Sequence, residues 1–464
     1  MAIAERITNF FVGIWLSVTM FFSGLSGFAI KTDVSKDAWY LKPPPANAAE
    51  QLAVLPSPRQ VAHAELEYYG FVHFGINTFT GREWGTGEED PALFNPAKLD
   101  TDQWARAMAD AGMKGAILTA KHHDGFCLWP SAYTEHSIKN SPYKGGQGDI
   151  VAEFAASCWK YGLKFGFYLS PWDRHEPTYG AGEAYNEFYQ QQLRELLTNY
   201  GEVAFVWLDG ANGEGPNGKK QEYDWPAFYA LVRELQPDAV MCVAGPDVAW
   251  VGNENGLANG NVSSIKGSPG NLRWAKSECD VSIRTGWFYH ENEKPKSLSQ
   301  LMHIYYNSVG MNCALLLNVP PDADGLFDQK DVCRLLELRG GIDKIYEAPV
   351  VAAEVSVDEA ILRDDARSYR LGDTEYAIDF RLESCARLKH VVLSEDSNAY
   401  SERIQAFSVY AKLGPLYLRV GRAQSAGNKT VVQLSPLTPW AKAYRVVIEQ
   451  AKANPVLRYI GLYQ

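Results

Sequence analysis

The chain contains few cysteines, and it has no run of basic residues. Seven cysteines are scattered through 464 residues, and none of them forms a Cys-x-x-Cys pair. This spacing argues against a zinc site built on cysteines and against a dense disulfide framework. Because the net charge is −11 and lysines and arginines do not cluster, the chain also lacks the electrostatic footprint of a nucleic-acid-binding protein.

Beyond its N-terminus the chain has no apolar run long enough to span a membrane. The N-terminus itself carries an uncharged stretch of 24 residues, 7–30, which follows Arg6 and ends near Gly27-Phe28-Ala29. These features predict a signal peptide over residues 1–29, and the length would also permit an uncleaved membrane anchor. Polar residues interrupt the apolar run and favour cleavage. We therefore expect an exported protein, either in a bacterial periplasm or secreted.

Aromatic residues are more abundant than usual. They make up 12% of the chain and include 13 Trp and 25 Tyr. A large core is one interpretation, and a sugar site is the other, because the flat apolar faces of sugars stack on aromatic rings. The hydrophobic content of 46% is typical of a folded globular protein, and the length indicates two or three domains.

The middle of the chain has the pattern of an α/β protein. Residues 30–64 include Lys42-Pro43-Pro44-Pro45-Ala46 and predict a leader or semi-rigid linker. From 65 to 350, short apolar runs alternate with longer amphipathic runs, which indicates βα units around a parallel sheet. The expected strands are 70–74, 115–119, 164–169, 203–208, 239–244 and 314–318. The expected helices are 101–111, 150–161, 183–200, 225–236 and 297–309.

Six or more such units favour a (β/α)8-like barrel of the TIM type. A doubly wound open sheet is the alternative, but its first strand should be followed by a glycine-rich phosphate turn. The first expected strand here ends instead in His73-Phe74-Gly75-Ile76-Asn77, which does not fit that turn.

The pattern changes after residue 350. Helical spacing gives way to short runs with period-two alternation separated by turn residues, which predicts an antiparallel β-sandwich domain over 351–464. The expected strands are 376–382, 388–393, 404–411, 416–420, 443–449 and 456–462.

Polar residues follow several of the expected barrel strands. The active site of a (β/α)8 barrel lies at the C-terminal ends of its strands. Those ends hold His73, His122, His123, Asp124, Tyr168, Trp172, Asp173 and Asp209. The loops between strands and helices add Glu83, Trp84, Glu254, Arg284 and Trp287. Carboxylates, histidines and tryptophans around one pocket are the groups expected for cleaving a glycosidic bond.

The adjacent histidines also raise the question of a metal. Neighbouring residues on a strand point to opposite faces, so His122 and His123 would not easily chelate one ion. The chain has no His-x-His or His-x-x-x-His pattern either. We therefore expect no metal and no cofactor, and a metal-dependent hydrolase that uses these histidines with Asp124 is the alternative. In the simplest interpretation, Asp209 caps a turn with Gly210 and Glu254 is a solvated loop residue.

Five motifs occur in order along residues 65–350. They are His73-Phe74-Gly75, Glu83-Trp84, Lys121-His122-His123-Asp124-Gly125-Phe126, Tyr168-Leu169-Ser170-Pro171-Trp172 and Trp207-Leu208-Asp209-Gly210. Together they resemble the α-L-fucosidases of glycoside hydrolase family 29. The expected C-terminal β domain also suits that family.

The resemblance implies retaining chemistry on a (β/α)8-like barrel. The nucleophile of the family is the aspartate of its Trp-x-Asp-Gly motif, which corresponds to Asp209 here. The residues that the resemblance assigns to the sugar pocket are His73, Glu83, Trp84, His122, His123, Tyr168, Arg284 and Trp287.

Two further segments, 245–254 and 275–284, resemble the subfamily that favours α-1,3- and α-1,4-linked fucose. In that subfamily the acid/base is the glutamate after Gly-Asn, which is Glu254, and Glu278 is the alternative. The implied substrate is a fucosylated oligosaccharide or glycoconjugate. A catalytically inactive fucose-binding protein on the same scaffold is the second interpretation, although both carboxylates are present.

Overall fold

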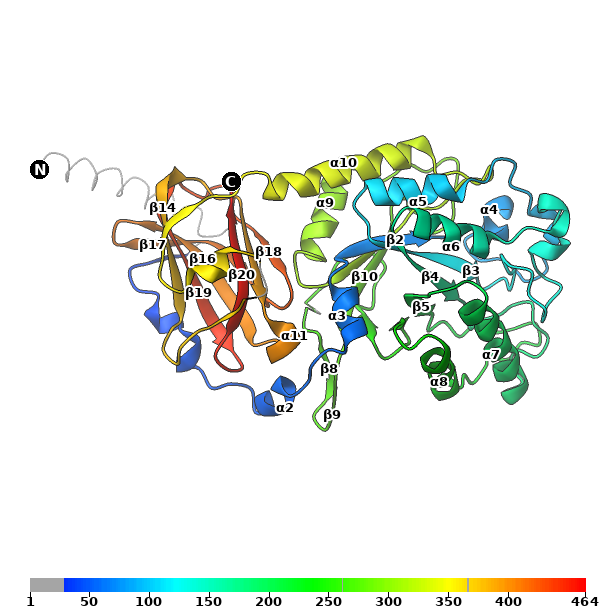
Figure 1. Ribbon diagram of the computed structural model, residues 1–464, viewed down its shortest axis with the longest axis horizontal. Helices are drawn as coiled ribbons and strands as arrows, with labels where there is room; N and C mark the ends of the chain where they lie inside the picture. The colour runs from blue at the N-terminus through cyan, green and yellow to red at the C-terminus, as the bar shows by residue number, and fades with distance from the viewer. Residues whose placement is uncertain (1–28, 261, 365–366) are drawn as a thin grey trace, which may run out of the picture. The chain divides into compact units, whose positions relative to one another are not determined.

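A computed structural model describes residues 29–260, 262–364 and 367–464 (Figure 1). The described chain divides into two compact units, one of residues 50–344 and one that combines residues 29–49 with 345–464. The expected signal peptide, apart from Ala29, lies outside the described residues. Among the helices of the described part, none is long and apolar enough to cross a membrane.

An eight-stranded parallel sheet forms the centre of the unit 50–344. Its strands follow the order β6-β5-β4-β3-β2-β11-β10-β7, and every hydrogen-bonded pair is parallel. The strands are β2 (Tyr68–Val72), β3 (Gly115–Lys121), β4 (Lys164–Leu169), β5 (Phe205–Leu208), β6 (Val240–Val243), β7 (Val248–Trp250), β10 (Lys276–Ser282) and β11 (Ala314–Asn318). Because β6 and β7 lie at the two ends of this order and still contact each other, the sheet is nearly closed. The expected (β/α)8-like barrel is confirmed.

Helices alternate with most of the strands along the chain (Figure 1). They are α3 (Pro58–Ala64), α4 (Ile76–Thr80), α5 (Thr101–Asp110), α6 (Ile150–Lys160), α7 (Glu183–Thr198), α8 (Trp225–Leu235), α9 (Leu298–Asn307) and α10 (Gln329–Tyr346). Helix α5 begins where the sequence predicts, because the Asp100 carboxylate accepts a hydrogen bond from the Gln103 N–H. It ends before Gly112, whose φ of +85° suits glycine.

Two of the barrel strands, β7 and β10, were not predicted. Strand β10 has the sequence Lys-Ser-Glu-Cys-Asp-Val-Ser, and all seven of its residues are buried. This strand does not form an apolar run, so hydrophobic periodicity does not reveal it. Its polar side chains are buried because hydrogen bonds within the protein replace those with water. The hairpin of β8 (Ile265–Ser268) and β9 (Asn271–Trp274) lies between these two strands in the chain.

Aromatic and aliphatic side chains fill the barrel interior. One cluster of buried residues joins side chains from seven strands and from the turn after α3: Leu66, Tyr69, Phe71, Ile117, Tyr168, Phe205, Trp207, Val240, Cys242, Val248, Ala314 and Leu316. Tyr168 and Trp207 belong to this cluster and are the next-to-last residues of β4 and β5. The candidate site residues lie at the same ends of the strands. The packed interior therefore sets the floor of the site.

Two antiparallel sheets form the other unit, as expected for a β-sandwich. The six-stranded sheet has the order β1-β17-β16-β19-β14-β12, and the four-stranded sheet has the order β13-β20-β15-β18. The strands after residue 350 are β12 (Ala352–Val355), β13 (Tyr369–Arg370), β14 (Ala377–Ala386), β15 (His390–Glu395), β16 (Ile404–Leu413), β17 (Leu416–Ala423), β18 (Thr430–Gln433), β19 (Ala441–Ala451) and β20 (Val456–Tyr463). Phe380, Val409, Tyr444 and Ile460 belong to the core between the sheets.

Part of the segment expected to be a linker is ordered on this sandwich. Strand β1 (Ile30–Lys31) pairs with β17, and the Trp39 indole donates to the Glu375 carbonyl at 3.0 Å. Val34 is buried in a small cluster with side chains of the six-stranded sheet. The proline run that follows is compatible with this docking because it requires no strand pairing of its own.

A close approach of neighbouring strands leads to a test of the barrel. A Cβ added at Gly166 in β4 would lie 2.7 Å from the Phe205 carbonyl oxygen on β5. We expect Gly166→Ala to destabilise the barrel by about 1–3 kcal/mol, as overpacking does. The matched control is Gly340→Ala in α10, where a Cβ would meet no atom within 4 Å. Thermal melting should show a lower midpoint for Gly166→Ala and an equal or higher midpoint for Gly340→Ala. Equal midpoints for both variants would contradict the packing of β4 against β5.

Candidate active site

His73 follows β2 and has a defined tautomer. Its backbone N–H and its Nδ1 both contact the Asn318 side-chain oxygen, at 3.0 and 2.9 Å. The Asn318 amide nitrogen donates to the Trp287 carbonyl, so its oxygen is the acceptor and Nδ1 of His73 carries the hydrogen. Burial lowers the pKa of His73 to about 3. The ring is therefore neutral, and its Nε2 is the unprotonated nitrogen.

His122 and His123 follow β3 and are both buried. Their ring centroids lie 4.2 Å apart, and Nδ1 of His123 donates to the Ser170 hydroxyl at 2.8 Å. Burial lowers the pKa of His123 to about 4 and holds that of His122 well below its ordinary value. Both rings are neutral at neutral pH and offer hydrogen-bonding nitrogens rather than charges.

Asp209 follows β5 and is held by two hydrogen bonds. Tyr168 at the end of β4 donates its hydroxyl to one carboxylate oxygen at 2.9 Å, and the Ala211 N–H donates to the other at 2.8 Å. Nε2 of His123 lies 3.8 Å from the oxygen that Tyr168 contacts. Asp209 is therefore fixed in orientation, and 23% of its side chain is exposed to solvent.

Tryptophan side chains border the same end of the barrel. Trp84 is 60% exposed, and its ring lies 6.3 Å from His123 and 6.0 Å from Trp172 between centroids. An exposed indole beside buried polar groups offers an apolar face to a ligand. The ring of Trp287 packs beside that of His73, and the two ring centroids lie 4.9 Å apart.

Glu83 and Glu254 both contact Trp287. One oxygen of Glu83 accepts the Trp287 backbone N–H at 2.8 Å, and the other lies 2.6 Å from Nε2 of His290. The Trp287 indole donates to the exposed Glu254 carboxylate at 3.1 Å. This indole joins Glu254 to the end of the barrel that carries His73, although the two residues are far apart in the sequence.

Arg284, which the resemblance places in the sugar pocket, is enclosed by acidic and aromatic partners. It is fully buried, and its guanidinium donates to Asp331 at 2.7 Å, to Asp328 at 2.8 Å and to the Glu293 carbonyl at 2.8 Å. The guanidinium also lies over the Tyr289 ring, 4.4 Å from its centroid. These partners use the donors of the guanidinium, so Arg284 stabilises the loop that presents Trp287.

Glu278 lies inside the barrel and has no exposed surface. The Tyr69 hydroxyl donates to one of its oxygens, and the Trp207 indole donates to the other at 3.0 Å. Burial raises the pKa of Glu278 to about 7, and these two donors act in the opposite direction. Both oxygens of Glu278 are therefore engaged in hydrogen bonds inside the barrel.

Two other acidic residues at the strand ends have structural roles. Asp124 accepts hydrogen bonds from the Phe126 N–H at 2.7 Å and from the Asn77 amide at 3.0 Å. Asp173 pairs with the buried Lys121 at 2.8 Å. These contacts shape the loops after β3 and β4.

The sequence interpretation missed three residues of the site. Asn318 ends β11 and sets the His73 tautomer, His290 holds Glu83, and Asp280 accepts the Trp250 indole N–H at 2.7 Å. Burial raises the pKa of Asp280 to about 8, and the charge of Glu254 adds to this effect. Asn318 could have been found, because it is a polar residue at the end of an expected strand. No comparable signal marks Asp280 in the unpredicted strand β10.

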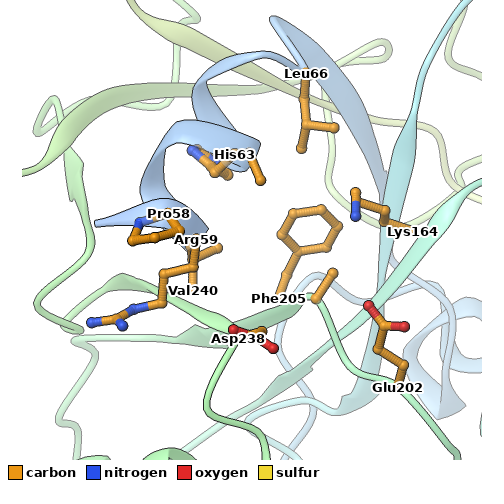
Figure 2. A pocket seen from close by; sticks show the side chains of 11 residues that line it. Pro58, Arg59, His63, Leu66, Lys164, Glu202, Phe205, Asp238 and Val240 are labelled. Carbon is orange, nitrogen blue, oxygen red and sulfur yellow. The ribbon is translucent and has the colours of Figure 1, made fainter. Parts of the chain in front are cut away.

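A cavity at the opposite end of the barrel is separate from this site. Its volume is about 270 Å³, and Lys164, Phe205 and Val240, which line it, stand at or beside the first residues of β4, β5 and β6 (Figure 2). The N-terminal ends of barrel strands serve stability rather than catalysis. The candidate active site is therefore the C-terminal end, where the carboxylates, histidines and tryptophans converge.

A parallel barrel with these groups at its strand ends has the architecture of a glycoside hydrolase. The chain matches the model of one such family, described as Alpha-L-fucosidase, over residues 46–340. It is 37% identical to α-L-fucosidase 1 of Arabidopsis thaliana, and the alignment covers 96% of this chain and 94% of that protein. The chain belongs to the α-L-fucosidase family, glycoside hydrolase family 29.

Solved structures agree with this family. A putative α-L-fucosidase from Bacteroides ovatus shares 40% identity with a TM-score of 0.82, and the match covers 94% of this chain and 77% of that one. A family 29 fucosidase from Ruminococcus gnavus, solved in complex with fucose, shares 30% identity with a TM-score of 0.80. That match covers 89% of this chain and 95% of that one.

The neutral histidines predict a pH dependence of stability. The pKa of His73 is about 3 in the folded protein and about 6.5 in an unfolded chain, so below pH 6.5 the unfolded chain takes up a proton that the folded chain does not. His73 therefore lowers stability as the pH falls from 6.5 towards 3. Relative to His73→Gln, the wild type should lose about 1.4 kcal/mol per pH unit in this window.

The measurement is the free energy of unfolding in urea at pH 7.0, 5.5 and 4.5. His303→Gln, at an exposed position of α9, is the control for the replacement of a histidine by glutamine. A difference between wild type and His73→Gln that does not change with pH would contradict a neutral buried His73.

Proposed function

We propose that the protein is an exo-acting, retaining α-L-fucosidase that removes terminal α-1,3- or α-1,4-linked fucose by double displacement. The observation that carries this proposal is the pair of carboxylates at one end of the barrel. Asp209 is fixed by Tyr168 and the Ala211 N–H, and Glu254 is held by the Trp287 indole beside His73.

Asp209 is the proposed nucleophile. One of its oxygens attacks the anomeric carbon of fucose, the bond to the leaving oxygen breaks, and a covalent fucosyl-enzyme forms. The hydrogen bonds from Tyr168 and Ala211 restrict the carboxylate to one orientation, which supports attack from a fixed direction.

Glu254 is the proposed acid/base. It protonates the leaving oxygen in the first step and removes a proton from the attacking water in the second, which releases fucose with retained configuration. Its exposed position supports this role, because the acid/base must reach both the aglycone and water. The enclosed position of Glu278 supports the choice of Glu254 over that alternative.

The other pocket residues are proposed to recognise fucose. Neutral His73, His122 and His123 offer ring nitrogens to the sugar hydroxyls, and the exposed Trp84 offers an apolar face to the C5 methyl group. The complex of the Ruminococcus gnavus relative with fucose supports this choice of sugar. The proposed linkage rests on the resemblance of segments 245–254 and 275–284 to one subfamily.

Alanine variants of Asp209, Glu254 and Glu278 test the assignment of the carboxylates. We expect Asp209→Ala to lose at least about a thousandfold in kcat on every α-L-fucoside, because no covalent intermediate can form. Glu254→Ala should lose activity on fucosylated oligosaccharides, and azide should partly restore its turnover of an aryl fucoside by replacing the activated water. The measurement is fucose release from a panel of α-1,2-, α-1,3-, α-1,4- and α-1,6-linked oligosaccharides, with and without azide.

The same panel includes Glu278→Ala and the wild type with EDTA as controls. Full activity with EDTA is expected, and its loss would favour a metal-dependent hydrolase. Full activity of Glu254→Ala together with loss of activity in Glu278→Ala would reverse the acid/base assignment. Fucose binding without hydrolysis of any panel member would identify a binding protein on this scaffold.

We also propose that the protein is exported. The support is the uncharged stretch 7–30 after Arg6, with small residues near its end. Expression of the full chain in a bacterium should yield a periplasmic protein whose intact mass corresponds to removal of about the first 29 residues, as in signal-peptide processing. Full-length protein in the membrane fraction would indicate an anchor, and full-length protein in the cytoplasm would contradict export.

A further inference from the structure

A chain of hydrogen-bonded polar groups runs through the barrel interior. Nε2 of His63 in α3 lies 3.1 Å from the Tyr69 hydroxyl of β2, which donates to one oxygen of Glu278 in β10. The other oxygen of Glu278 accepts the Trp207 indole N–H of β5 at 3.0 Å. His63 also lines the cavity at the N-terminal end of the barrel, so this chain of hydrogen bonds begins near that end (Figure 2). It ends at Trp207, two residues before Asp209.

The centre of this chain is a carboxyl group with no access to water. Burying such a group is unfavourable unless hydrogen bonds replace its hydration. Tyr69 and Trp207 supply one donor for each oxygen of Glu278. Ligand atoms of His63, Cys242 and Glu278 lie within 4.8 Å of one another, a spacing that could also hold a metal ion. The two donors already satisfy the carboxyl, so no bound cation is needed to explain its burial.

Trp207 connects Glu278 to Asp209 through its contact with Tyr168. Its ring packs against Tyr168 with centroids 5.3 Å apart, and against Phe71 at the same centroid distance. Tyr168 in turn holds Asp209 through the 2.9 Å hydrogen bond of its hydroxyl. A rotation of the Trp207 indole would therefore displace the ring that orients the Asp209 carboxylate.

We propose that Glu278 is a positioning residue for the reaction: as the acceptor for the Trp207 indole, it fixes the Trp207–Tyr168 pair that orients Asp209. This inference deepens the proposed function and rests on it. Glu278 touches no substrate and transfers no proton. Its role requires a hydrogen-bond acceptor facing Trp207, and neither a charge nor an acidic proton.

The requirement for an acceptor separates two substitutions at this position. Glu278→Gln keeps a side-chain oxygen for the Trp207 indole, while its amide group can donate to the Tyr69 hydroxyl. Glu278→Met has a similar volume but offers no comparable acceptor. We expect Glu278→Gln to retain kcat within about threefold and Glu278→Met to lose about tenfold or more, because small displacements of a reacting group are costly. KM for an aryl fucoside should change by less than about threefold in both.

A double-mutant cycle tests whether Trp207 carries the effect. Trp207→Phe removes the indole donor, so Glu278→Met should cause little further loss of kcat in that background. Tyr69→Phe is the comparison, because it removes the other donor and leaves the bond between Glu278 and Trp207 in place. If Glu278→Met does not fold, the contrast still applies: Trp207→Phe must lower kcat and Tyr69→Phe must not.

Glu395→Met is the matched control for the loss of a buried carboxyl group. Glu395 is buried in the β-sandwich, where it accepts backbone N–H groups of Arg403, Ile404 and Gly427. This variant should melt at a lower temperature than the wild type and keep its kcat per folded molecule. Circular dichroism gives the folded fraction of each variant.

The outcomes distinguish this inference from the proposed function. A Glu278→Gln variant as slow as Glu278→Met, or rescue of either variant by azide, would show that Glu278 acts through its proton. A kcat of Glu278→Met equal to that of Glu395→Met would overturn the positioning role alone. A wild type that neither binds L-fucose in calorimetry nor hydrolyses any fucoside would overturn the proposed function and this inference with it.

Discussion

The parallel arrangement of the barrel strands is the constraint on which the site depends. Because all eight strands run in the same direction, their C-terminal ends meet at one end of the sheet. This brings together His73 after β2, His122 and His123 after β3, and Asp209 after β5. None of these residues needs a long loop to reach the others, so the fold itself limits their freedom before a substrate binds.

Burial without charge is the second property of the site. His73, His122 and His123 are enclosed and neutral, and hydrogen bonds with Asn318 and Ser170 orient the rings of His73 and His123. The same principle applies deeper in the barrel, where Glu278 is satisfied by hydrogen bonds alone. Such fully bonded polar groups fix the orientation of the aromatic rings around them, which suits a site that must recognise hydroxyl groups.

Sequence reasoning succeeded where a local pattern carries the information. The apolar runs before His73, His123 and Asp209 predicted both the strands and the placement of these residues. A run of apolar residues is typical of a buried strand, and the polar residues that follow the run mark the end of the strand. It failed for β10, whose polar side chains are buried against partners from distant strands. It also did not reveal the buried ion pairs of Arg284, since the acidic partners of this residue lie more than 40 residues further along the chain.

The sequence by itself determined the alternation of strands and helices, the change to β structure after residue 350, and the motifs of a glycoside hydrolase. These features depend on neighbouring residues and on spacing along the chain. Only the tertiary structure decided which carboxylates face solvent and which are enclosed. The sequence around Glu254 and Glu278 does not distinguish their environments. Glu254 is exposed and accepts the Trp287 indole N–H, whereas Glu278 is buried and accepts hydrogen bonds from Tyr69 and Trp207. Those partners are distant in sequence, and only closure of the barrel brings them into contact.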